Sequence, residues 1–173
     1  EEILREGSQV VPQSQVLIGN LINLYVDRKQ TKEAIEYLQQ AISRNPTAQL
    51  YNVLGSVQES AGDLDNALIN FNKAIQLDEN YVDAIANIGR LYYNQGVKIE
   101  EEAMDTKDPA KKKEMDTQKN DKIRQALPYF EKAYELNMED PQVQTMLRQT
   151  YYRLGQADPK FKMKHPELSR GDF

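Results

Sequence analysis

The sequence predicts an all-α fold in which helical hairpins follow one another along the chain. Helix-forming residues dominate, and the 173 residues include only 8 Gly and 7 Pro, a composition that favours helices. Gly7, Ala41 and Ala74 are spaced by 34 and then 33 residues, and Pro12 and Pro46 are also 34 residues apart. Internal similarity at this period is typical of a repeated helix-turn-helix unit.

The clearest unit spans residues 48–81 and predicts two short amphipathic helices. Small, apolar and aromatic residues, with one Gln, recur at helical spacing on one face of each helix, namely Tyr51, Leu54, Gly55 and Gln58, then Ala67, Phe71 and Ala74. Gly62 supplies a helix stop between them, and Asp63 or Asp65 can cap the second helix. The small residues allow two helices to cross closely, and the aromatic residues fill the wider gaps.

The same pattern recurs in register elsewhere in the chain. The repeat from residue 15 has Ile18, Leu21, Ile22, Tyr25, Ala34, Leu38, Ala41 and Pro46; the third has Ile85, Ile88, Gly89, Tyr92, Ala126, Phe130 and Ala133; the fourth begins with Gln144, Leu147, Arg148 and Tyr151. This pattern resembles the tetratricopeptide repeat over nearly all of residues 1–155. The resemblance implies a right-handed α-solenoid of stacked helix-turn-helix hairpins.

We interpret residues 1–173 as a single domain of such repeats. Its expected parts are a partial repeat at 1–14, full repeats at 15–47 and 48–81, a repeat at 82–140 that contains an insertion at 97–125, a partial C-terminal repeat at 141–164 and a tail at 165–173. Ile3, Leu4, Gly7 and Pro12 fit the end of a second helix whose first helix is missing. We therefore expect a further repeat upstream, or another subunit that covers this end.

The insertion is the individual feature of this chain. The 29 residues from Val97 to Gln125 contain eight Lys or Arg and eight Asp or Glu. Such a composition is compatible with a disordered loop, but apolar residues keep helical spacing into and out of the stretch, and Asp108-Pro109 suits a helix start. We therefore predict one elongated helical hairpin, in which Ile99 faces Ile123 and Met104 approaches Met115.

Composition excludes several classes of function. The net charge of −5 argues against a nucleic-acid partner. The chain has no Cys and a single His, His165 in the expected exposed tail, so neither a catalytic triad nor a His or Cys metal cluster can be assembled. No apolar run is long enough to span a membrane. We expect no enzyme activity, no cofactor and no metal.

The family resemblance implies a protein or peptide partner, bound in a concave groove lined by the first helix of each repeat. Mapped onto this chain, the expected groove residues are Asn20, Asn23, Gln49, Asn52, Ser56, Asp83, Asn87, Arg90, Tyr93, Asn94, Gln149, Tyr152 and Arg153. The set is rich in amides, which can bond an extended peptide backbone in both directions. The pattern only partly resembles the carboxylate clamp of some family members, because its lysines are missing here and Asp83 stands in place of one.

Two functions remain open at this stage. The first is a non-catalytic interaction scaffold; the second is a self-associating structural building block of a cell-envelope assembly. Residues 126–155, with the charged insertion, look like tetratricopeptide repeat proteins of Bacteroidetes, many of which are exported to the cell envelope. This looser resemblance favours the periplasm or cell envelope and leaves the cytoplasm open.

Overall fold

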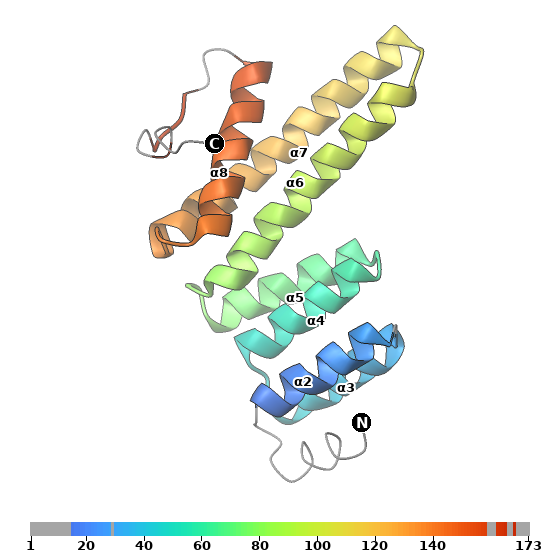
Figure 1. Cartoon of the computed structure of the whole chain (residues 1–173), viewed down its shortest axis with the longest axis vertical. Coiled ribbons are helices and arrows are strands. Elements are labelled where there is room, and N and C mark those ends of the chain that lie inside the picture. The colour runs from blue at the N-terminus through green and yellow to red at the C-terminus, as the bar shows by residue number, and fades with distance from the viewer. Residues whose placement is uncertain (1–14, 29, 159–161, 166–167, 169–173) are drawn as a thin grey trace. The chain divides into compact units, whose positions relative to one another are not determined.

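The computed structural model describes residues 15–28, 30–158, 162–165 and 168, without the side chains of residues 15–17, 21, 23 and 26. The described part is all-α and contains no strand (Figure 1). Its helices are α2 (Gln15–Asp27), α3 (Thr31–Arg44), α4 (Ala48–Ser60), α5 (Leu64–Leu77), α6 (Val82–Asp105), α7 (Pro109–Leu136) and α8 (Pro141–Ala157). The predicted partial repeat at 1–14 lies outside the described residues.

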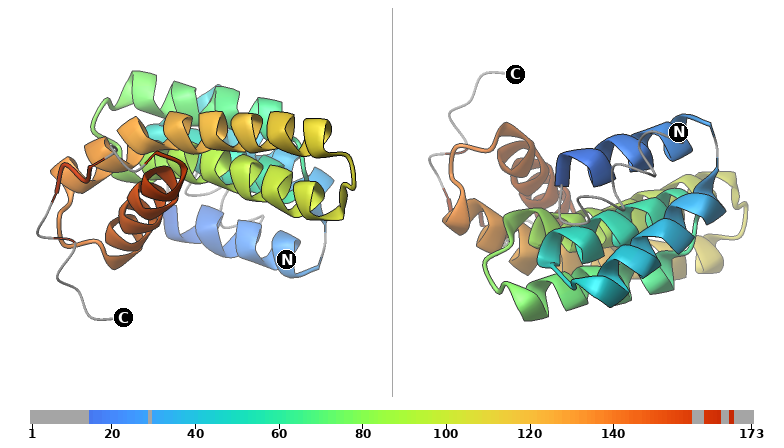
Figure 2. Two further views of the ribbon diagram at one scale, coloured as in Figure 1. Left: turned by 90° about the horizontal axis from the view of Figure 1, so that it is seen from above. Right: turned by 90° about the horizontal axis from the view of Figure 1, so that it is seen from below.

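The chain divides into two compact units, Glu1–Tyr81 and Val82–Phe173. In unit 1, α2 packs on α3, α3 on α4, and α4 on α5. In unit 2, α6 and α7 form a long antiparallel hairpin, and α8 packs mainly on α7 with a smaller contact to α6 (Figure 1, Figure 2). The predicted all-α class and its hairpins are therefore confirmed.

In unit 1, the helices of the second hairpin cross at a glycine. A β-carbon added at Gly55 of α4 would lie 2.6 Å from Phe71 Cε1 and 3.1 Å from the carbonyl oxygen of Ala67. Phe71 and Ala67 are fully buried on α5. Gln58, where the repeat pattern has a Tyr, accepts a buried 2.7 Å hydrogen bond from the Asn70 amide. The polar group is thus satisfied within the hairpin.

The ends of these helices follow from local side-chain chemistry. Thr47 accepts a hydrogen bond from the Leu50 backbone N–H at 3.2 Å, and Asp63 accepts one from Asn66 at 3.3 Å. Each of these bonds satisfies a backbone donor that the first turn of a helix leaves open. Gly62 has a φ of +83° in the turn between α4 and α5, a conformation that disfavours residues with a β-carbon.

The insertion forms two continuous helical arms. The predicted elongated hairpin is therefore confirmed, and the alternative of a disordered loop is wrong. α6 has 24 residues and α7 has 28, compared with 13 and 14 in the α4–α5 hairpin. At about 1.5 Å per residue, the arms are longer by roughly 17 and 21 Å. Asp108 caps α7 by accepting the Ala110 N–H at 2.9 Å, and Pro109 takes the first helical position, where its missing N–H has no cost.

The observed packing inside this hairpin brings Gly96 of α6 against Ile123 of α7. Gly96 lies against Ile123, which is 1% exposed, whereas Ile99 is only half-buried. The expected approach of Met104 to Met115 stays a prediction; Met104 is 73% exposed, whereas its neighbour Ala103 is 3% exposed. Gly96 lets α6 approach α7 closely, so that Ile123 fits over the glycine.

The segment after α8 returns to α7 within unit 2. Lys164 forms a 2.9 Å ion pair with Glu135, and the His165 ring packs edge-on against Tyr134 with centroids 4.9 Å apart. Leu168 is 7% exposed. His165 is therefore half-buried against α7, which corrects the expectation of an exposed tail histidine. The remaining tail positions, 166–167 and 169–173, lie outside the described residues.

Candidate functional site

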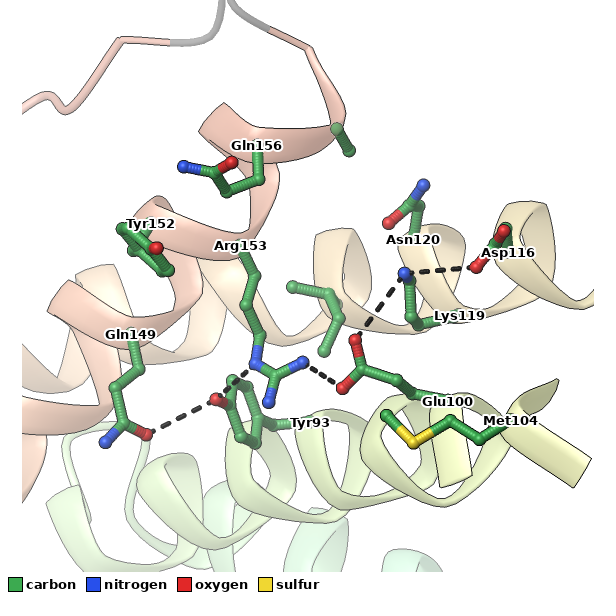
Figure 3. Close-up of a pocket in the computed structure, with 12 residues that line it drawn as sticks. Tyr93, Glu100, Met104, Asp116, Lys119, Asn120, Gln149, Tyr152, Arg153 and Gln156 are labelled. Atoms are coloured by element: carbon green, nitrogen blue, oxygen red, sulfur yellow. Dashed lines mark hydrogen bonds and ion pairs between the residues drawn. The ribbon is translucent and has the colours of Figure 1, made fainter. Parts of the chain in front are cut away.

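The three helices of unit 2 line an open pocket of about 720 Å³ (Figure 3). Its lining comes from every helix of the unit: Tyr93, Glu100 and Met104 from α6; Asp116, Lys119, Asn120 and Ile123 from α7; Gln149, Tyr152, Arg153, Gln156 and Ala157 from α8. The insertion at residues 97–125 contributes six of these lining residues. The volume is in the range of sites that bind small molecules or side chains.

Arg153 connects α8 to α6 across the pocket. Its Nε donates a 2.8 Å hydrogen bond to the Tyr93 hydroxyl, which in turn donates to Gln149 Oε1 at 3.3 Å. The guanidinium carbon lies 5.5 Å from the centroid of the Tyr93 ring. Arg153 Nη1 also donates to the Glu100 carboxylate, as Figure 3 shows. One cation therefore holds a tyrosine and a carboxylate from α6.

Glu100 lies between two cations. One carboxylate oxygen pairs with Arg153, and the other lies 3.7 Å from Lys119 Nζ. Lys119 also pairs with Asp116 at 3.2 Å. Burial lowers the pKa of Arg153, but the hydrogen bonds to Glu100 and Tyr93 outweigh it and raise that pKa above its usual value. The guanidinium stays charged, and the four charges of the pocket sum to zero.

Large apolar surfaces line the pocket beside these charges. Tyr152 of α8 is 68% exposed and Met104 of α6 is 73% exposed, whereas Ile123 is 1% exposed. The pocket therefore combines a buried aliphatic side chain with exposed tyrosine and methionine side chains. Tyrosine and methionine are both enriched where proteins contact partners, since each offers a broad surface with limited polarity.

Four of the predicted groove residues meet at this pocket: Tyr93, Gln149, Tyr152 and Arg153. The others on α6 do not line it. Arg90 donates a 3.0 Å hydrogen bond to the side chain of Asn87, one helical turn back, and Asp83 and Asn94 are exposed. The groove role of these residues stays a prediction.

The predicted groove residues of unit 1 are distributed over α2 and α4. Asn20 is exposed on α2, and the side chain of Asn23 lies outside the described residues. On α4, Gln49 is half-buried and Asn52 is 9% exposed. The Ser56 hydroxyl donates to the Asn52 carbonyl at 3.1 Å, so it bonds its own helix. Their binding role also stays a prediction.

Sequence reasoning missed the residues that the insertion brings to the site. Glu100 and Met104 lie 7 and 11 positions after Tyr93, so they continue the same helical face. On α6 the predicted groove residues ended at Asn94, near where the first helix of a standard repeat ends, although the helical period continued beyond it. Lys119, Asp116 and Asn120 had no comparable signal, because their placement depends on how α7 packs along α6.

Two searches of the described residues bear on other site types. No group of three or more His, Cys, Asp or Glu side chains in this part of the chain is arranged to hold a metal ion. Within the same residues, no helix combines the length and apolarity required to cross a membrane.

Comparisons with known proteins point to one repeat family. A TPR repeat model matches residues 55–96, and a tetratricopeptide repeat model matches residues 19–47. Together they cover the α2–α3 hairpin in large part and the region from α4 into α6. No curated protein matches the sequence significantly.

Solved structures with the same fold are distant in sequence. The first TPR domain of Spaghetti (RPAP3), bound to the HSP90 peptide SRMEEVD, is 17% identical with a TM-score of 0.60, covering 83% of this chain and 94% of that one. A human IFIT1 dimer with m7Gppp-AAAA is 21% identical with a TM-score of 0.70, covering 97% and 36%. A TPR repeats protein from Bacteroides fragilis is 21% identical with a TM-score of 0.55, covering 75% and 63%. These similarities show a shared fold.

Proposed function

Because this chain is a tetratricopeptide repeat protein, we propose that it is a protein-interaction scaffold that binds an extended peptide segment of a partner at the pocket of unit 2. The pocket is the observation that carries the proposal. It lies between α6 and α8, which we predict to be the first helices of two successive repeats. In this repeat family the first helices line the surface that contacts partners.

The chemistry of the pocket suits a protein segment. Its aromatic and thioether groups can cover an apolar side chain, and its amides can bond a peptide backbone as donor or acceptor. The net charge of −5 and the balanced charges of the pocket favour a protein partner over a nucleic acid. That a related fold in RPAP3 is solved with a peptide gives further support.

The elongated hairpin gives the site a feature of its own. α7 contributes Asp116, Lys119 and Asn120 to the lining, all within the insertion. We assign the insertion the role of a second wall, which widens the contact surface from two first helices to three helices. The partner, the cellular location and self-association through the ends of the solenoid stay predictions.

Selection of binding peptides tests the proposal. Linear random peptides displayed on phage are selected against the whole chain, and the affinity of the best peptide is then measured for Tyr152→Ala and Met138→Ala. Tyr152 is 68% exposed at the pocket, and Met138 is 55% exposed at the α7–α8 turn outside it. Removing a contact tyrosine should weaken binding about tenfold or more, whereas Met138→Ala should leave the affinity unchanged.

Two results would reject the proposal. If Tyr152→Ala binds as tightly as the wild type, the peptide contacts another surface. If no peptide is selected and the chain elutes as a larger species when its concentration is raised, self-association is the better account of what this fold does.

A further inference from the structure

We propose that Glu100 determines the ligand preference of this pocket, so that it accepts an uncharged apolar or aromatic side chain and rejects an acidic one. The inference rests on the proposed function and adds the chemical class of the bound side chain. Three features of the pocket support it: the charge pairing around Glu100, the neutral groups that remain available, and the position of Glu100 in the insertion.

The charge pairing gives both cations of the pocket a carboxylate partner. Arg153 and Lys119 both face the Glu100 carboxylate, and Lys119 has Asp116 as a second partner. An acidic side chain would have to displace Glu100 and leave it without a partner, at a site where its side chain is 29% exposed. Separating a partly buried ion pair in this way is unfavourable. A basic side chain would meet two cations whose carboxylate partners are already taken.

Neutral groups of the pocket remain available to a ligand. Tyr152 and Met104 present exposed apolar surface. The side-chain amides of Asn120 and Gln156 form no hydrogen bond with another described residue. An apolar side chain carried on a peptide backbone matches this set, because the backbone can bond the amides while the side chain covers the apolar surface.

Glu100 belongs to the insertion, so this preference is a property of the elongated hairpin. In the absence of its carboxylate, Arg153 and Lys119 would face the cavity with only Asp116 to balance them. The pocket would then carry one net positive charge and should accept a carboxylate. The pocket would thus owe its specificity to the Glu100 carboxylate, which disfavours binding of an acidic side chain.

The test uses three capped tripeptides, N-acetyl-Ala-X-Ala-amide, with Leu, Glu or Lys at X. Their dissociation constants are measured by NMR titration of the whole wild-type chain, of Glu100→Gln and of Glu101→Gln. Glu101 is the matched control, because it is exposed, adjacent and absent from the pocket lining. Dispersed amide spectra and unchanged thermal midpoints establish that each variant is folded.

The wild type and Glu101→Gln should bind the Leu peptide at least about threefold more tightly than the Glu or Lys peptide. Glu100→Gln should bind the Glu peptide about fivefold more tightly than the wild type does. That gain should disappear when sodium chloride is raised from about 50 to about 500 mM, because salt screens a solvent-accessible ion pair.

The outcomes separate this inference from the proposed function. If the wild type binds the Leu peptide at the pocket but Glu100→Gln gains nothing for the Glu peptide, the role of Glu100 is wrong and the binding site stands. If the wild type prefers the Glu peptide, the preference is the reverse of the one inferred. If no tripeptide shifts the pocket resonances of any variant, both the inference and the site are overturned.

Discussion

Gly96 of α6 lies directly under the side chain of Ile123 of α7, and this contact sets the spacing of the elongated hairpin. A β-carbon at Gly96 would stand 2.7 Å from Ile123 Cδ1 and 3.2 Å from the carbonyl oxygen of Lys119. Ile123 and Lys119 both line the pocket. The closeness of the two arms therefore positions the side of the binding site that α7 contributes.

Gly96→Ala should lower the stability of unit 2. Alanine improves helix propensity by about 1 kcal/mol, but overlap in a packed core costs about 1–3 kcal/mol, and we expect a net loss of about 1 kcal/mol. Ile123→Val removes the Cδ1 atom that a β-carbon would meet, so Gly96→Ala should be less harmful in that background by at least about 0.5 kcal/mol. Denaturant unfolding of the four proteins of this cycle measures the coupling.

Gly19→Ala is the control for this cycle. Among the described residues, a β-carbon at Gly19 of α2 meets nothing within 4 Å, so the same substitution there should raise stability by up to about 1 kcal/mol. Equal stabilisation at Gly19 and Gly96 would show that the two arms of the hairpin do not constrain each other.

Gly62→Ala should destabilise unit 1 by about 1 kcal/mol or more. The φ of +83° at Gly62 lies in the left-handed region, which costs a residue with a β-carbon about 1–2 kcal/mol. Gly62→Asn should cost less, since asparagine tolerates this conformation. Thermal unfolding compares the variants, and identical midpoints for Ala and Gly at this position would contradict the turn geometry.

Asp108→Ala should loosen the start of α7. Asp108 accepts backbone hydrogen bonds from Ala110 at 2.9 Å and Lys111 at 3.4 Å, and loss of such a cap costs about 1 kcal/mol. Amide hydrogen exchange should therefore accelerate over the first turn of α7. Asp105→Ala, at the C-terminal end of α6, is the control and should leave exchange in α7 unchanged. A uniform response to both variants would exclude a specific cap.

Docking of the C-terminal segment on α7 should weaken in acid. The hydrogen bond from Lys164 lowers the pKa of Glu135 and raises the pKa of Lys164. Because the pKa of Glu135 is lowered, its contribution to docking is complete above the pKa of a free carboxyl group. That contribution is lost as the pH falls through the pKa of Glu135 in the folded protein. The raised pKa of Lys164 means that its contribution is lost only as pH rises through that value.

The ion pair should therefore stabilise the docked C-terminal segment to the same extent between about pH 5 and 10. This stabilisation should decrease below about pH 4. Chemical shifts of the Lys164 amide, compared between the wild type and Glu135→Gln, isolate this pair from the neighbouring His165. An acid transition that is the same in both proteins would show that the ion pair does not hold the segment.

The hairpins could be predicted from the sequence because their determinants are local. Gly62, Asp63, Asp108 and Pro109 mark helix ends by their own backbone or side-chain chemistry, and the structure places the ends at these positions. The helical arms of the insertion were predictable for the same reason, since apolar residues kept their period despite the high charge of the stretch.

The site could be predicted only in part because it depends on tertiary packing. Tyr93, Gln149, Tyr152 and Arg153 were expected from the repeat pattern. Glu100, however, pairs with Arg153 across 53 residues, and its neighbours in the sequence are equally charged. The helical period from Tyr93 places Glu100 on the face of α6 that lines the pocket, but only the packing of α7 and α8 against α6 brings Lys119 and Arg153 to its carboxylate.

The most direct test of the account locates a bound peptide on the protein. A peptide from the phage selection, synthesised with a benzophenone side chain at one position after another, is irradiated with the whole wild-type chain, and mass spectrometry identifies the modified residues. The account predicts cross-links to Met104, Tyr152 and Gln156 around the pocket. Cross-links confined to α2–α5, or to the α7–α8 turn at Met138, would contradict it.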